Sequence, residues 1–205
     1  FLQHLFGNYF TIVPLLFGAF DREFGQVSRP AEIPGMTDFL AALKQYISED
    51  PGDTLVVAGV DLSHIGPKFA HRDSAHVMLP ETKKHDRQVI DAICRGDVNE
   101  LWGIIAGVRD RFNVCGFSTL ACLLEVLPPS RGIELGYDIY DEEQTKSAVS
   151  FAAVTMLQES GEKPRADDGE QSTTYKKDPR TGKWIIQNPA GSMGYNYLYR
   201  DPDDW

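Results

Sequence analysis

This chain of 205 residues has few cysteines, no long apolar run and no excess of positive charge. Its three cysteines lack short paired spacing, which argues against a disulfide framework or a zinc ribbon and fits a reducing cytoplasm. No apolar run approaches the roughly 20 residues needed to cross a bilayer, and no signal-like segment opens the chain. We therefore expect a cytoplasmic protein without a membrane partner.

The charge balance narrows the class of partner. The chain has 20 basic and 30 acidic residues, which gives a formal net charge of −10. Such a balance repels phosphate backbones and argues against nucleic acid as a partner. A hydrophobic content of 42% suffices for the core of one domain.

An apolar β-type run breaks abruptly into polar residues within residues 54–69. Residues 55–60 predict a strand buried on both faces, as in the middle of a parallel sheet. Asp61, Ser63 and His64 follow it, and ligands gather outside the carboxyl ends of such strands. The sequence therefore predicts a site here. The alternative is a helix start, in which Asp61 or Ser63 caps free N–H groups and His64 merely packs nearby.

A second segment that can carry chemistry, residues 113–127, has a Cys-Gly pair at 115–116 and continues as an apolar helical pattern. Cys115 therefore lies at or just before a helix N-terminus. The helix dipole there favours the thiolate, which is the form that binds metals and reacts with oxidants. Cys94 and Cys122 fall among apolar helical positions, where a cysteine usually acts as a small hydrophobic residue.

Three stretches together resemble the Memo family, whose bacterial and archaeal members are called AmmeMemoRadiSam system protein B. These stretches are VVAGVDLSHIGPKF, NVCGFSTLACLLEVL and SAVSFAAVTM, and the opening FLQHLFGNYFTIVPLLFG is similar too. The resemblance covers about residues 1–157 in the expected order, which is more specific than any single motif.

The resemblance implies an α/β fold like that of the class III extradiol dioxygenases (LigB-like): a three-layer sandwich with a central, mostly parallel sheet flanked by helices. Asp61 and His64 match the family's Asp-x-x-His element, and Cys115 matches its Cys-Gly. Family members bind iron or copper through this cysteine and two histidines of the amino-terminal half. Since the chain starts at Phe1, after the point where those histidines stand, we expect an amino-terminally truncated member. His4 does not replace them and is expected to be a partly exposed helix histidine.

The donor set predicts a redox-metal site, with Cys115 as a soft ligand, His64 as a ligand or proton shuttle, and Asp61 orienting His64. The resemblance then implies dioxygenase-like oxidation of a small molecule or peptide, with a radical S-adenosylmethionine protein and an AMMECR1-type protein as pathway partners. Two alternatives stay open. One is a non-catalytic protein that binds a peptide or metabolite, and the other is a hydrolase with Cys115 as nucleophile and His64 as base.

The pattern along the rest of the chain predicts three regions. They are a Memo-like α/β domain at residues 1–157, a polar linker at 158–174 and an aromatic extension at 175–205 that starts with a hairpin. Within the first region we expect helices at 37–49, 79–96 and 98–106, and strands at 8–17, 132–140 and 148–156. We expect Phe20 and Phe24 to hold a long loop, residues 18–35, against the core.

The remaining candidate side chains receive secondary roles. His71 is expected at the rim of the pocket, and His76, five residues away, does not share a helix face with it. His85 lies in a charged run that is typical of a solvated surface. Tyr137 and Tyr140 could face the pocket or pack with their hydroxyls at the surface.

Overall fold

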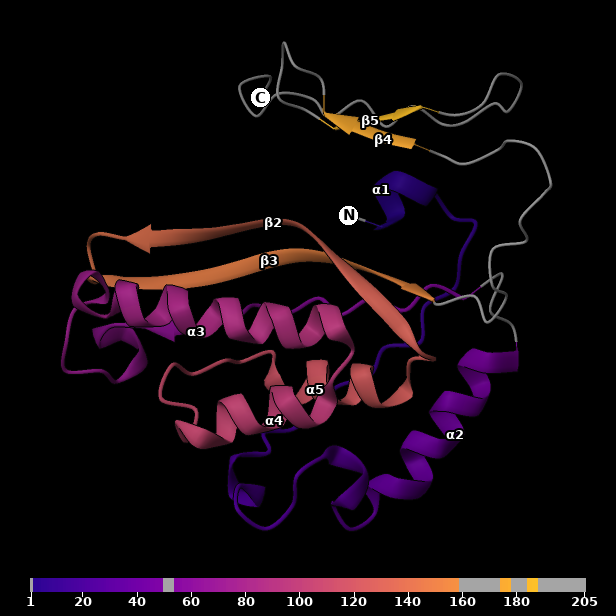
Figure 1. Cartoon of the computed structure of the whole chain (residues 1–205), viewed down its shortest axis with the longest axis horizontal. Helices are drawn as coiled ribbons and strands as arrows, with labels where there is room; N and C mark the ends of the chain where they lie inside the picture. The colour runs from indigo at the N-terminus through magenta and orange to yellow at the C-terminus, as the bar shows by residue number, and fades with distance from the viewer. Residues whose placement is uncertain (1, 50–53, 159–173, 178–183, 188–205) are drawn as a thin grey trace. The chain divides into compact units, whose positions relative to one another are not determined.

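The computed structural model describes residues 2–49, 54–158, 174–177 and 184–187, and the chain divides into two compact units, residues 1–159 and 160–205. In the first unit the helices are α1 Leu2–Phe6, α2 Met36–Glu49, α3 Ala75–Arg95, α4 Val98–Gly107 and α5 Phe117–Val126, with short 3-10 turns at Asp21–Glu23, Pro30–Glu32 and Pro67–Phe69 (Figure 1). Its strands are β1 His64–Ile65, β2 Ser130–Glu142 and β3 Ser147–Gln158. In the second unit β4 Thr174–Lys177 pairs antiparallel with β5 Trp184–Gln187, which confirms the predicted hairpin.

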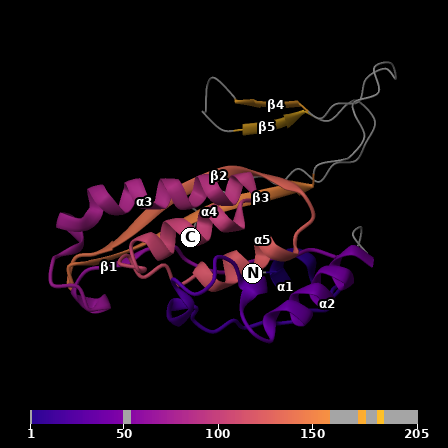
Figure 2. The ribbon, with the colours of Figure 1, turned by 60° about the horizontal axis from the view of Figure 1, so that its bottom comes forward.

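The core of the first unit is built mainly by α3, α4 and α5, which pack on one another in sequence order (Figure 2). Each helix turns an apolar stripe inward. The fully buried members of these stripes include Val89, Ile90, Leu101, Ile105 and Ala121. Burial of each such valine, leucine or isoleucine side chain contributes about 1.5–3 kcal/mol. These helices therefore form the scaffold on which the loops rest.

Aromatic contacts around Trp102 hold the long loop that precedes α2. The ring of Phe20 stacks on Trp102 at 6.0 Å, and the ring of Phe24 meets it edge-on at 6.0 Å. Phe117, the first residue of α5, packs against the same indole at 5.1 Å. The prediction that Phe20 and Phe24 fasten this loop to the core is therefore confirmed.

The three-stranded sheet has β3 in the middle, paired antiparallel with β1 and β2. Exposed and half-buried side chains alternate along β2, which indicates one covered face, and α3 packs on that face. A bulge between Glu134 and Gly136 shifts the register of β2. Gly132 and Tyr137 are five positions apart and would lie on opposite faces of a regular strand, but the bulge lets both face α3. A Cβ atom on Gly132 would lie 2.6 Å from Cα of Cys94, so strand and helix touch at this glycine.

Most predicted elements of the first unit are present with shifted ends. The expected helices at 37–49, 79–96 and 98–106 correspond to α2, α3 and α4, and the strands at 132–140 and 148–156 to β2 and β3. Helix α3 starts four residues earlier than expected, at Ala75, and contains Pro80. Because proline is unfavourable inside a helix, Pro80 makes the first turn of α3 hard to predict from the sequence.

Two predicted strands are wrong. Residues 8–17 and 54–60 have no regular secondary structure, and within the described residues no backbone hydrogen bond joins 11–17 or 54–60 to another segment. Several of their apolar side chains are exposed, among them Leu16 at 99% and Leu55 at 70%, so residues 55–60 are not buried on both faces. An apolar run has strand propensity, but it forms a strand only where a neighbouring strand supplies hydrogen-bond partners.

The described sheet is not parallel. All three described strand pairs are antiparallel, so the helices and strands support an α/β composition but not the predicted mostly parallel sandwich. The reason lies in the connection between β2 and β3, a tight turn at residues 143–146 that returns the chain in the opposite direction. A parallel pair needs a much longer crossover.

Parts of the predicted extension cannot be compared with the structure. The polar linker, except for residues 158 and 174, and the tyrosine-rich residues 188–205 lie outside the described residues. Among the helices that are described, none has both the length and the apolar character required to span a membrane.

His85 is buried at 5% exposure in α3, so its predicted surface position is wrong. Its ring lies 4.6 Å from that of Phe112, and in the described part of the chain neither ring nitrogen has a hydrogen-bond partner. Burial lowers the pKa of His85, and the carboxylate of Asp86, with a backbone contact at Ile104 that falls short of hydrogen-bond geometry, offsets this only in part. The core therefore holds a neutral imidazole.

The free energy of unfolding should decrease as the pH falls below about 6.5, the ordinary pKa of histidine, because the unfolded chain then binds a proton that folded His85 excludes. The slope contributed by this one group is at most about 1.4 kcal/mol per pH unit. Urea denaturation across this range measures it. His85→Leu should flatten the profile, whereas His76→Gln, at an exposed position of the same helix, should not. An identical pH profile for His85→Leu and the parent would contradict this assignment.

Candidate metal site

Three potential metal ligands from distant segments meet at one place on the first unit. One ligand atom each of Asp61, His64 and Cys115 lies within 4.8 Å of the others. Asp61 and Cys115 are exposed, and His64 is half-buried. The structure thus brings together the three side chains that the sequence motifs singled out.

The imidazole of His64 is held by a backbone carbonyl and lies near Asp61. Its Nδ1 lies 3.1 Å from the carbonyl oxygen of Leu62, and since a carbonyl only accepts, Nδ1 carries the proton. Nε2 is then left with a lone pair and lies 3.8 Å from Oδ2 of Asp61, which is beyond hydrogen-bond range but within ion-pair distance when the ring is protonated. The ring also meets Phe69 edge-on at 4.9 Å. The Leu62 carbonyl therefore fixes the tautomer, and the orienting role of Asp61 stays a prediction.

Cys115 lies two residues before α5, close to the predicted position at a helix N-terminus. Its Sγ is 3.9 Å from the backbone oxygen of Asp61. Partial burial raises the pKa of the Cys115 thiol; the contact with the Asp61 backbone opposes this, and the negative charges of Asp61 and Asp110 add to it. A raised pKa favours the protonated thiol, so the expected thiolate is not supported in the absence of a cation. A bound cation would reverse this by favouring the deprotonated sulfur.

A close backbone contact brings the two segments of the site together. An ideal Cβ atom on Gly116 would lie 2.5 Å from the Asp61 carbonyl oxygen and 2.7 Å from Cγ2 of Val60. Only glycine permits this approach, which sets Asp61 directly beside Cys115. The sequence showed the Cys-Gly pair, but no local pattern indicates which segment lies against the glycine.

The turn before Cys115 is tied to the segment that carries His64. Asn113 adopts a left-handed backbone conformation, with φ at 49°, and its side-chain amide donates to the carbonyls of His64 and Phe69 at 3.2 and 3.1 Å. Asp110 accepts a hydrogen bond of 2.8 Å from the N–H of Val114. These polar side chains were not singled out from the sequence, although asparagine and aspartate are typical of such turns.

His71 links the same two segments. Its Nδ1 accepts from the Gly66 N–H at 3.2 Å, so Nε2 carries the proton and donates to the Arg111 carbonyl at 2.7 Å. Gly66 itself has a φ of 102°, and a 3-10 turn begins at Pro67, so the chain turns sharply here. Both His71 nitrogens are thus occupied by the backbone, and His71 supports the site without joining the three ligand atoms.

A buried network lies behind the site. Ser63 donates to Oδ1 of Asp86 at 2.5 Å, and Tyr137 donates to Oδ2 at 2.8 Å. Burial raises the pKa of the Tyr137 hydroxyl, and the bond to Asp86 reinforces the shift. The backbone N–H of Ser63 also donates to Oγ of Ser150 at 2.9 Å. Ser63 is therefore neither a helix cap nor a ligand, and it anchors the residue before His64 to the core.

The other candidate side chains lie apart from the three ligands. Tyr140 is 62% exposed, while Tyr137 points to Asp86, so the two tyrosines take different roles. Cys122 is buried, and burial raises its pKa to about 12; burial also raises the pKa of half-buried Cys94. Both cysteines act as small hydrophobic residues, as predicted. His4 is an exposed helix histidine, also as predicted.

Replacing Gly116 with alanine should disrupt the site, since its Cβ would clash with the Asp61 backbone. We expect a loss of about 1–3 kcal/mol in unfolding free energy, typical of overpacking, measured by urea denaturation. The matched control is Gly103→Ala in α4, where a Cβ meets nothing within 4 Å and the higher helix propensity of alanine should stabilise the chain. Equal stability changes in the two variants would refute the proposed contact.

Comparison with known families gives a consistent match. The family model described as Memo-like protein matches residues 1–155. A MEMO1 family protein of Aquifex aeolicus is 29% identical over 113 residues, which cover 54% of this chain and 29% of that protein. A MEMO1 family protein of Thermus thermophilus is 27% identical over 115 residues, which cover 56% of this chain and 34% of that protein.

The matched part spans about a third of the length of these curated relatives. The family model, in contrast, covers most of the present chain, including all three ligands of the site. The chain therefore belongs to the Memo-like protein family.

Proposed function

We propose that this Memo-like protein binds a redox-active metal, iron or copper, through His64 and Cys115 with Asp61 as the third ligand. The proposed activity is a dioxygenase-like oxidation of a small molecule or peptide. The observation that carries the proposal is the convergence of three different donor groups within 4.8 Å.

The chemistry of the donors fits such a metal. Thiolate and imidazole together suit copper and iron, whereas a site for magnesium or calcium would be built from oxygen ligands. The Nε2 lone pair of His64 is free because the Leu62 carbonyl holds the proton on Nδ1. Typical ligand bonds to nitrogen and sulfur are about 2.0–2.3 Å, so small side-chain movements would bring all three atoms to one ion.

Each residue has a distinct task in this proposal. Iron or copper would supply the one-electron and oxygen chemistry that protein side chains lack. His64 is held rigidly by Leu62 and Phe69 and serves as the preorganised ligand. Asp61, with its side chain 54% exposed, is free to move toward the ion, and the Cys115 thiol gives up its proton when the ion binds.

The biological setting is part of the same proposal. We place the protein in the cytoplasm, in a pathway with a radical S-adenosylmethionine protein and an AMMECR1-type protein, and its support is the family resemblance. Among the described residues, the proposed site has three protein ligands, Asp61, His64 and Cys115.

The two alternatives have less support in the geometry. A hydrolase would need Cys115 as a thiolate, but its pKa is raised and the charges nearest to it are negative. A purely binding protein would use the same surface without turnover, and no contact in the described residues favours it over a metal site. The metal site remains the better account of the converging donors.

Metal content should depend on the three ligands and on no other cysteine or histidine. After anaerobic loading with Fe(II) or Cu(I) and desalting, we expect Cys115→Ser and His64→Gln each to weaken binding by at least about tenfold. Metal analysis by mass spectrometry, together with a thiolate absorption band that Cys115→Ser abolishes, measures this. The matched controls are Cys94→Ser and His76→Gln, which leave the site intact.

Two outcomes would overturn the metal proposal. One is equal metal content in the ligand variants and their controls, which would indicate adventitious binding. The other is the absence of metal together with a hydrolytic activity that a thiol reagent and Cys115→Ser both abolish, which would establish the nucleophile instead.

A further inference from the structure

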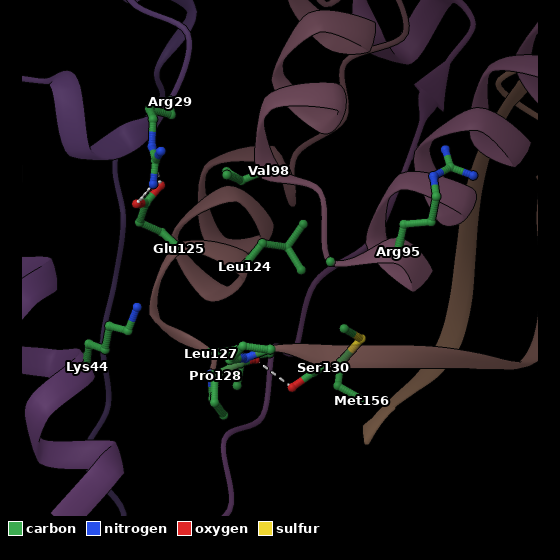
Figure 3. A pocket seen from close by; sticks show the side chains of 12 residues that line it. Arg29, Lys44, Arg95, Val98, Leu124, Glu125, Leu127, Pro128, Ser130 and Met156 are labelled. Carbon is green, nitrogen blue, oxygen red and sulfur yellow. Dashed lines mark hydrogen bonds and ion pairs between the residues drawn. The ribbon is translucent and has the colours of Figure 1, made fainter. Parts of the chain in front are cut away.

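A second site lies away from the three metal ligands. A cavity of about 410 Å³ opens where α2, α5, the junction of α3 and α4, and the start of β2 come together (Figure 3). None of Asp61, His64 and Cys115 lines it. Its volume falls within the range of small-molecule sites, about 300–1,000 Å³.

The charged groups of the cavity are mainly positive, although the chain as a whole carries a net charge of −10. Arg29, Lys44 and Arg95 contribute to the lining, against a single acid, Glu125. Arg95 pairs with Glu100, which does not line the cavity, and in Figure 3 it extends away from the other charged groups. The charge available to a ligand therefore comes from Arg29 and Lys44.

Arg29 is held in place by a two-point ion pair with Glu125. Its Nε lies 3.1 Å from one carboxylate oxygen, and Nη2 donates to the other. The Glu125 side chain is only 8% exposed, so its charge is fully engaged by the guanidinium. A guanidinium has five N–H donors and this pair uses two, which leaves three for another acceptor.

Lys44 is the cation without a partner on this wall. It is exposed on α2, and no ion pair or side-chain hydrogen bond in the described ranges involves its ammonium group. In Figure 3 its amine points toward the Arg29–Glu125 pair. An ammonium without a described partner that lines the same cavity as a fixed guanidinium provides a place for one additional negative charge.

The other wall of the cavity is apolar. It is formed by Leu124 and Leu127, near the C-terminal end of α5, and by Met156 of β3. The end of a helix carries a partial negative charge that disfavours an anion, so Lys44 is needed to make anion binding favourable. The combination of one polar, cationic wall and one apolar wall matches an amphipathic anion.

We propose that this cavity binds a small organic carboxylate with an apolar body. Lys44 and the free N–H groups of Arg29 hold the carboxylate, and Leu124, Leu127 and Met156 cover the apolar part. A monoanion suits the site because, among the described residues, Lys44 is the one cation of the lining without an ion-pair partner, whereas a more highly charged ligand would face the Glu125 carboxylate. This site is independent of the metal proposal.

The test uses the full chain with phenylbutyrate and its neutral amide, phenylbutyramide, as probes. Titration at low salt, followed by methyl NMR and calorimetry, should shift the methyl signals of Leu124, Leu127 and Met156 with phenylbutyrate. Lys44→Gln should weaken its binding about fivefold, the effect of one partly exposed ion pair. Lys84→Gln, on an exposed part of α3, is the matched control and should bind like the parent.

Four results would overturn the proposal. The first is equal affinity for the acid and the amide, and the second is equal affinity in Lys44→Gln and Lys84→Gln. The third is a change in thermal stability of Lys44→Gln without any change in binding, which would show that Lys44 only neutralises the end of α5. Methyl shifts confined to exposed residues such as Leu55 would likewise locate binding elsewhere.

Discussion

The site depends on one close contact, the approach of the Asp61 backbone and the Val60 side chain to Gly116. Asp61 and Cys115 are 54 residues apart, and no strand pairing joins their segments. The Asp61 carbonyl oxygen lies 2.5 Å from where a Cβ atom of residue 116 would be, so any side chain there would separate the carboxylate from the thiol. A single missing side chain thus determines whether three donors surround one point or lie apart.

Backbone hydrogen bonds hold the segment that carries His64 from Leu62 onward. Residues 54–60 make no backbone hydrogen bond within the described chain, whereas the N–H of Leu62 donates to Ser150 and that of His64 to Phe112. Ser63 adds a bond to buried Asp86, whose charge would be costly to bury without its two hydroxyl donors. His64 is consequently fixed and Asp61 is adaptable, which is a useful division for a site that must close around an ion.

Local signals in the sequence predicted local structure well, and non-local pairing poorly. The Cys-Gly pair lies just before an apolar helix, where the motif indicated, because a helix start depends on adjacent residues. The apolar run at 55–60 has strand propensity but does not identify a pairing partner, so the predicted parallel sheet is not formed by the described strands. The charged neighbours of His85 indicate a surface position, yet it is buried in α3 with Thr82 and Val89. These three residues have the three- and four-residue spacing of one helix face, which is visible in the sequence.

Electrostatics separates the two proposed sites and argues for their different ligands. The charged groups that shift the Cys115 pKa are Asp61 and Asp110, both negative, and together with burial they keep the thiol protonated. A nucleophilic cysteine needs the opposite surroundings, with cations that stabilise the thiolate, whereas a metal ion is attracted by the same carboxylates and then supplies the positive charge itself. The cavity beside α5 has more positive than negative side chains. Its lining includes Lys44, which has no partner among the described residues, and the Arg29–Glu125 ion pair. The carboxylates near Cys115 therefore suit a bound cation, whereas the cations that line the cavity beside α5 suit an organic anion.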